Sequence, residues 1–153
     1  MAITVLAVGK IKEKYFAQAI VEYSKRLKPY AVLKVVELEP ISFSGANQEK
    51  SKREEGKSIA KFLEKQIDKF VIVLDENGQQ FNSVKFASYL EKINKPIFIV
   101  IGGTVGLADD VKNKADLKLS LSALTFPHEL ARVILFEQLY RAATIVSKKS
   151  YHY

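Results

Sequence analysis

Glycine is concentrated in one turn, Gly102-Gly103-Thr104-Val105-Gly106, directly after an apolar run. Because glycine has no side chain, such a turn lets a ligand approach the backbone closely. The spacing is GGxxG, which is neither the G-x-G-x-x-G dinucleotide fingerprint nor a phosphate-binding loop ending in G-K-[ST]. The pattern therefore indicates either a ligand site or a tight strand-to-helix turn.

A second stretch that could bind a ligand runs from Leu121 to Phe126 and is ended by Pro127. It is mostly small or apolar, with two hydroxyls. Such a loop offers backbone N–H and C=O groups to an adenine-like edge while its apolar side chains cover the ring face. A plain strand-to-helix connection is the alternative. Ser120 and Ser122 are not expected to be acyl-transfer nucleophiles, because neither lies in a G-x-S-x-G motif.

Charged groups follow in an apolar helical stretch. His128 could contact a substrate or form a local hydrogen bond at the helix start. Arg141 lies four residues after Glu137, a spacing that predicts an ordinary helix-face ion pair. An arginine in so apolar a helix could also bind an anionic group. Glu137 would then be its partner when no anion is bound, because burying an unpaired guanidinium costs free energy.

The C-terminal tail, Ser150-Tyr151-His152-Tyr153, is polar and aromatic and follows two lysines, Lys148 and Lys149. Aromatic rings beside lysines suit base stacking and phosphate contact. A frayed terminus is the alternative.

The composition limits the chemistry. The chain has 153 residues, no cysteine and two histidines, His128 and His152. Disulfides, thiolate ligands and thiol nucleophiles are thereby excluded, and no metal site is expected. We expect a cytoplasmic protein with no membrane association, since there is no signal peptide and no apolar run of ~18 residues.

The formal net charge is +7, which favours an anionic partner such as nucleic acid, or a solubilising surface. The region from Lys10 to Lys34 is basic, and the tail after Arg141 carries lysines but no acid. In contrast, the segment from Gln48 to Lys69 is mixed in sign, as is typical of a solvated helix face.

The elements that must position these residues alternate along the chain. Short apolar runs predict buried strands, and apolar positions at helical spacing predict helices. Asp75 to Gly78 predicts a turn, and Ser83 is expected to cap a helix. The expected strands span 3–8, 32–38, 70–74, 97–101 and 117–121, and the expected helices 13–27, 48–66, 84–93, 107–114 and 129–147. This alternation predicts one α/β domain over residues 1–153, a mostly parallel five- to six-stranded sheet with helices on both faces.

The last expected helix is apolar around most of its circumference, so it must be buried on most sides. In a domain this small, the sheet covers only one side. We therefore expect the other side to pack against a second copy in a homodimer. A long loop over that side is the alternative.

Several motifs, taken together, resemble the RlmH family, which consists of SPOUT (α/β-knot) methyltransferases acting on large-subunit ribosomal RNA. These motifs cover the whole chain: ITVLAVGKIKEKYF, VIVLDENG, FIVIGGTVGL, LSLSALTFPHELARVILFEQLYRA and the terminal YHY. The resemblance implies a C-terminal trefoil knot, a homodimer, S-adenosylmethionine as cofactor and methylation of N3 of a pseudouridine in 23S rRNA of the assembled ribosome. The implied substrate-side residues are His128, Arg141, Tyr151 and His152.

The resemblance also implies the cofactor site. The family pattern leads us to expect more polar or acidic residues where this chain has Thr104-Val105, so a backbone role is implied for the turn. The implied cofactor residues are Leu74, Gly102, Gly103, Gly106, Leu121, Ser122, Ala123, Leu124, Thr125 and Phe126.

Two other classes stay open. A dinucleotide-dependent oxidoreductase is suggested only by the α/β alternation, and no G-x-G-x-x-G follows the first expected strand, which ends in Ala7-Val8-Gly9-Lys10. A non-enzymatic RNA-binding or ribosome-associated dimer is suggested by the charge and the tail.

Overall fold

A computed structural model describes residues 1–153 as a five-stranded sheet in which all neighbouring strands are parallel. The strand order is β2-β1-β4-β3-β5. The expected sheet is thus confirmed, with five strands. Their bounds are β1 Ala2–Val8, β2 Val32–Leu38, β3 Phe70–Gln80, β4 Ile97–Ile101 and β5 Leu117–Ser120.

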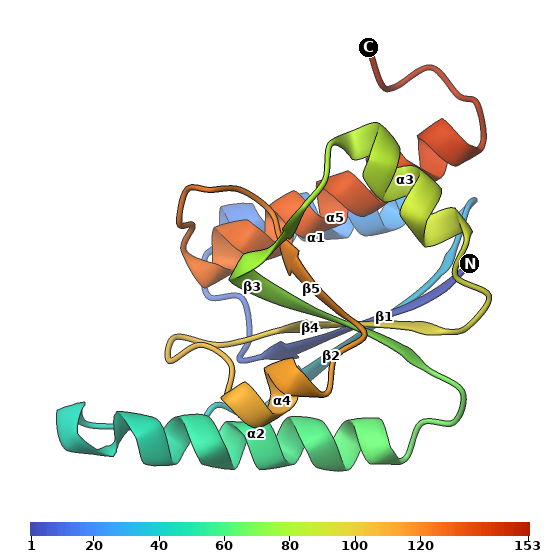
Figure 1. Cartoon of the computed structure of the whole chain (residues 1–153). Coiled ribbons are helices and arrows are strands. Elements are labelled where there is room, and N and C mark those ends of the chain that lie inside the picture. The colour runs from blue at the N-terminus through green and yellow to red at the C-terminus, as the bar shows by residue number, and fades with distance from the viewer.

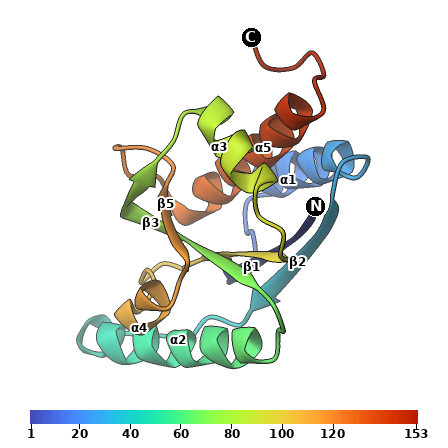
Figure 2. The same ribbon diagram turned by 45° about the vertical axis from the view of Figure 1, so that its right-hand side comes forward.

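Helices cover both faces of this sheet (Figure 1). On one face lie α1 (Lys14–Leu27), α3 (Ser83–Glu91) and α5 (His128–Val146). The other face is covered by α2 (Gln48–Glu64) and α4 (Asp109–Asn113), as the turned view in Figure 2 also shows. A short 3-10 helix, Gly45–Asn47, precedes α2. No helix has the length and apolarity that crossing a bilayer requires.

The strand residues divide between two cores because successive side chains point to opposite faces. In β1, Val5 packs on the α1–α3–α5 side, whereas Leu6 packs on the α2–α4 side. Both are fully buried. The continuous apolar runs in the sequence are therefore explained by cover on both faces, with each fully buried aliphatic side chain contributing about 1.5–3 kcal/mol.

The turn expected at Asp75 to Gly78 is a bulge within β3. Leu74 and Gln79 both pair with Leu119, so the intervening residues are extra in β3. The Asp75 carboxylate accepts the Asn77 N–H at 3.1 Å, which is the local bond that made the stretch resemble a turn. A Cβ at Gly78 would lie 2.6 Å from the Lys118 backbone, so only glycine fits where the strand rejoins the ladder.

Asn82, not Ser83, caps α3. The Asn82 side chain accepts the Lys85 N–H at 2.8 Å. The Ser83 hydroxyl instead donates to Gln138 Oε1 on α5 at 2.8 Å, tying the two helices together. Asn and Ser are comparable N-cap residues, so local sequence does not decide between Asn82 and Ser83. The contact of Ser83 with α5 decides it.

The last helix, α5, is covered by more than the sheet. Both α1 and α3 pack along it within the same chain, which the sequence argument did not include. On the inner side of α5, Leu135, Phe136 and Leu139 are fully buried. On its outer side, a stripe that includes Leu130 and Ile134 is half-buried.

Candidate active site

A cavity of about 530 Å³ opens at the ends of β4 and β5, beside the bulge in β3. Parallel strands bring their carboxyl ends to one edge, which is where open α/β sheets bind ligands. Three connections line the cavity: the β3 bulge, the glycine turn after β4, and the loop between β5 and α5. Its size lies within the roughly 300–1,000 Å³ of small-molecule sites.

The glycine turn forms one wall because side chains are excluded there. A Cβ at Gly102 would lie 2.9 Å from the Gly106 carbonyl carbon, and one at Gly103 would lie 3.2 Å from Val8 Cγ1. Gly106 has φ +76°, which favours glycine, and its N–H donates to the Gly103 carbonyl at 3.1 Å. The turn is therefore compact, and its backbone faces the cavity directly.

Hydroxyl groups hold the opposite loop in shape. The Ser120 hydroxyl donates to the Ser122 carbonyl at 2.9 Å, and the Ser122 hydroxyl accepts the Leu124 N–H at 3.0 Å. The Thr125 hydroxyl donates to Glu76 Oε2 at 3.1 Å, joining the loop to the β3 bulge. Thus, of the two loop hydroxyls, that of Ser122 holds the shape of the loop and that of Thr125 ties the loop to the β3 bulge.

Nine of the ten expected cofactor residues line this cavity. The exception is Ala123, which is exposed on the loop. His128, expected on the substrate side, also lines the cavity at the first residue of α5. The structure therefore brings these residues together around one space, and their roles as ligand contacts stay predictions.

Two lysines at the cavity were not anticipated. Lys52 of α2 and Lys112 of α4 both line it. Lys112 Nζ lies 3.5 Å from the Asp75 carboxylate, whose side chain is largely buried. Lys52 occupies a segment that the sequence indicated to be an ordinary solvated face, and no sequence signal marks it as different from its neighbours.

Arg141, Tyr151 and His152 form a second cluster, because the tail folds back on the end of α5. Arg141 donates from Nε and Nη2 to Glu137 Oε1 at 2.9 and 2.6 Å. Its Nη1 lies 3.3 Å from His152 Nδ1, and the guanidinium lies 4.7 Å from the centre of the Tyr151 ring. The helix-face ion pair is thus present, and it also organises the tail.

Tyr151 is held as a neutral phenol. Burial, a hydrogen bond with Tyr23 and the nearby Glu137 charge raise the pKa of Tyr151 to about 12. A raised pKa means that the protonated form persists as the pH rises beyond 10. At neutral pH the phenol donates a hydrogen bond to Glu137 Oε1, at 3.2 Å, and it does not accept a proton.

The four expected substrate-side residues are split within one chain. His128 is the first residue of α5 and Arg141 lies thirteen residues later in the same helix. At 1.5 Å per residue, about 20 Å separates them along the helix axis. The tail cluster accordingly does not reach the cavity of its own chain.

Arg132 is a buried arginine that the sequence interpretation overlooked. It is 2% exposed, and it donates from Nη1 to Glu37 Oε1 at 2.6 Å and from Nη2 to the Gly9 carbonyl at 2.8 Å. One turn earlier, Glu129 accepts the backbone N–H groups of Lys12 and Glu13. These contacts fix the first turns of α5, beside the cavity, to the ends of β1 and β2. The sequence does carry a signal for this residue, because Arg132, like Arg141, is a charged residue in an apolar helix.

Replacing Arg132 with alanine is expected to lower the free energy of unfolding by about 2–4 kcal/mol, because a buried ion pair and a carbonyl contact are lost together. This loss is smaller than the roughly 3–5 kcal/mol typical of breaking a fully buried ion pair, because the Glu37 side chain is 31% exposed and can be rehydrated. Urea unfolding measures the change. Arg26→Ala, which breaks the exposed pair with Glu22, is the control and should cost much less, because water and salt screen an exposed pair. Equal losses for the two variants would show that Arg132 is not an anchor.

Comparison with known proteins places this chain and its fold in a class. A family model described as a predicted SPOUT methyltransferase matches residues 1–152. A solved probable methylase family protein from Haemophilus influenzae Rd KW20 superposes with TM-score 0.60 and 16% identity, over 99% of this chain and 70% of that one. A putative RNA methyltransferase from Bacillus anthracis gives TM-score 0.58 and 15% identity, over 99% and 100%. At such identities the likeness concerns the fold.

Curated relatives refine this class. Ribosomal RNA large subunit methyltransferase H 1 of Clostridium perfringens (strain SM101 / Type A) is 44% identical over 158 residues, covering 99% of both chains. Ribosomal RNA large subunit methyltransferase H of Natranaerobius thermophilus is 44% identical over 160 residues, covering 100% of both. The chain therefore belongs to the SPOUT methyltransferases and, within them, to the family of ribosomal RNA large subunit methyltransferase H. The resemblance noted in the sequence is confirmed.

Proposed function

We propose that this protein transfers a methyl group from S-adenosylmethionine to N3 of a pseudouridine in 23S rRNA of the assembled ribosome. It acts in the cytoplasm as a homodimer, each chain being one domain with a C-terminal trefoil knot. The observation that carries the proposal is the glycine-walled cavity at the carboxyl edge of the sheet. It occurs in a chain that is 44% identical, end to end, to proteins named ribosomal RNA large subunit methyltransferase H.

The residues at the cavity fit the proposed cofactor. Side chains are excluded at Gly102 and Gly103, so a flat or extended ligand can lie against the backbone there. The preformed Leu121–Phe126 loop can pair its backbone with the edge of an adenine ring, and Leu124, 73% exposed, is free to cover the ring face. When bound, S-adenosylmethionine supplies an electrophilic methyl group on a sulfonium.

A dimer completes the site. The tail cluster lies about 20 Å from the cavity along α5 of its own chain, which supports a partner that supplies the tail to each cavity. The half-buried stripe on α5, with Leu130 and Ile134, gives a two-fold interface an apolar surface beside the cavity. Arg141, Tyr151 and His152 of one subunit then hold the target nucleotide over the cavity of the other.

Catalysis rests on positioning. Holding the methyl donor and the uracil nitrogen in line contributes several kcal/mol, up to ~11, to lowering the barrier. The N3–H proton must also leave. Tyr151 is a poor base, because its pKa of about 12 keeps the phenol protonated. His152, a water molecule or a phosphate of the ribosome remain as acceptors.

Mixed dimers test the shared site. A heterodimer of a Gly102→Ala chain with an Arg141→Ala chain keeps one cavity and one tail intact, on different subunits. If the site is shared, each heterodimer should have about half of the wild-type rate, since one of its two symmetry-related sites is intact. If each chain is self-sufficient, the heterodimer should be as inactive as the two parent homodimers. Co-expression with two affinity tags gives the pure heterodimer for the assay.

Calorimetric titration separates the proposed function from the other two classes. S-adenosylmethionine should bind in the presence of an rRNA fragment, with NAD as the control ligand. Binding of NAD alone would instead favour an oxidoreductase. Binding of RNA with neither cofactor would favour the non-enzymatic RNA-binding dimer, which the net charge of +7 and the aromatic tail also suit.

A further inference from the structure

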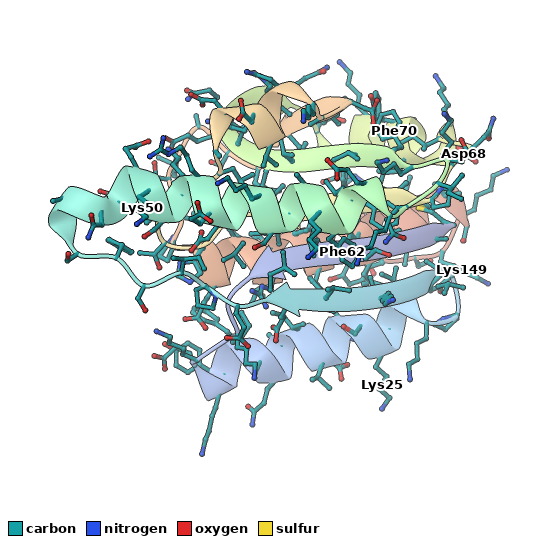
Figure 3. All side chains as sticks on the ribbon, turned by 90° about the horizontal axis from the view of Figure 1, so that it is seen from below. Lys25, Lys50, Phe62, Asp68, Phe70 and Lys149 are labelled. Atoms are coloured by element: carbon teal, nitrogen blue, oxygen red, sulfur yellow. The ribbon has the colours of Figure 1, made fainter.

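A groove between α2 and α4 lies on the face of the sheet opposite α5. Its volume is about 400 Å³, and its apolar floor includes Ile59, Val71 and Val111. The two helices approach closely, since a Cβ at Gly56 would lie 2.9 Å from Ala108 Cβ. Figure 3 looks onto this face, where Lys50 and Phe62 mark the course of α2.

The rim of the groove is predominantly basic. Four cationic residues line it against two acidic ones, Glu64 and Asp110; the cations are Arg53, Lys57, Lys69 and Lys114. Arg53 and Lys114 are exposed and form no ion pair with a carboxylate, so both can receive an anion. Lys57 pairs with Glu54 at 3.0 Å, but its side chain is 74% exposed, so the pair is readily exchanged.

The groove adjoins the cofactor cavity. On α2, Lys52 lines the cavity while the next residue, Arg53, lines the groove. On α4, Lys112 lines the cavity and Lys114 the groove. Lys112 is paired with Asp75 and Asp109, so the unpaired positive charge beside the cavity comes from Lys52, Arg53 and Lys114. A strand that leaves the cavity over these helices meets this charge along its path.

We propose that this groove binds the phosphate backbone of the substrate rRNA next to the target nucleotide, with Arg53 and Lys114 as its principal phosphate contacts. The inference rests on the proposed function, and it assigns RNA binding to a face of the protein away from the tail cluster. Release of counterions from the phosphates provides the affinity, and the apolar floor accommodates a ribose or the face of a base. The cationic excess favours RNA over an apolar peptide as the occupant.

The double variant Arg53→Ala/Lys114→Ala tests the groove. With ribosomes lacking the modification, KM should rise roughly 10-fold or more, because two phosphate contacts are lost. The kcat should stay within about twofold, since neither residue contacts the cavity. The slope of log KM against log salt should fall by about 1.4–1.8, at 0.7–0.9 per lost phosphate contact.

The matched control is Lys34→Ala/Lys92→Ala, which removes the same charge from exposed residues outside the groove. Its KM and salt slope should stay near those of the wild type. If both double variants shift KM and slope equally, only net charge matters and the groove is not a binding site. A wild-type protein that transfers no methyl group at all would instead refute the proposed function, which distinguishes the two failures.

A photo-crosslinking residue at position 57 identifies the occupant directly. With ribosomes bound, the crosslinked product should be destroyed by ribonuclease and should map to 23S rRNA near the methylated site. A product that resists ribonuclease and contains a ribosomal protein would overturn the proposal in favour of a protein docking surface.

Discussion

Alanine in place of Arg141 is expected to lower kcat/KM for methyl transfer by about 100- to 1,000-fold without disrupting the proposed dimer. The loss has two physical causes. In the proposed site a charged donor to the substrate disappears, and removing one positioned donor from an active site can cost about 2.7–4 kcal/mol. The tail also loses its anchor, since Arg141 contacts His152 Nδ1 at 3.3 Å and lies over the Tyr151 ring. Steady-state transfer of labelled methyl groups to ribosomes measures the effect.

Three companion variants interpret that result. Arg141→Lys keeps the charge but not the paired donation to Glu137, so its activity should be intermediate. Deleting residues 150–153 distinguishes two roles of Arg141, holding the tail and contacting the substrate. If Arg141 acts only through the tail, adding Arg141→Ala to the deletion lowers kcat/KM no further. Arg26→Ala removes a guanidinium 6.0 Å from the Tyr140 ring and should leave transfer nearly unchanged. Light scattering that finds Arg141→Ala monomeric would mean that the ion pair serves assembly instead.

The substitution Gly102→Ala is expected to weaken binding of S-adenosylmethionine at least about 100-fold. Its Cβ would lie 2.9 Å from the Gly106 carbonyl carbon and 3.1 Å from the Leu107 nitrogen, both backbone atoms that cannot move without opening the turn. A displacement of even ~1 Å in a positioning element can cost 100-fold. Calorimetric titration in the presence of an rRNA fragment measures the dissociation constant.

Gly45→Ala is the matched control, because nothing lies within 4 Å of a Cβ at that position. It should bind the cofactor like the wild type. The melting temperature of Gly102→Ala should be compared as well, since binding is interpretable only if the variant is folded at the assay temperature. A folded Gly102→Ala protein with wild-type affinity would show that the glycine turn is not the wall of the cofactor site.

The sheet could be predicted because its signal is local. Runs such as Ile97 to Ile101 are continuously apolar, and all five residues are buried, as a parallel strand covered on both faces requires. The cavity was also predictable from the sequence, because the strands expected at 70–74, 97–101 and 117–121 are parallel and must end at one edge of the sheet. The GGxxG turn and the Leu121–Phe126 loop follow two of those strands.

Long-range contacts set the limit of that prediction. The bulge in β3 depends on Gly78 approaching Lys118, forty residues away in sequence. Arg132 acts through Glu37 and Gly9 near the other end of the chain. The tail cluster is separated from the cavity by the length of α5, which the sequence predicts, and by the path of the tail, which it does not.

The most direct test of the central proposal is transfer of labelled methyl groups from S-adenosylmethionine to ribosomes that lack the modification, with free 23S rRNA assayed in parallel. Label should enter the 23S rRNA of intact ribosomes at a single pseudouridine, on N3, and the free RNA should be a much poorer substrate. No incorporation into either substrate would contradict the proposed methyltransferase activity.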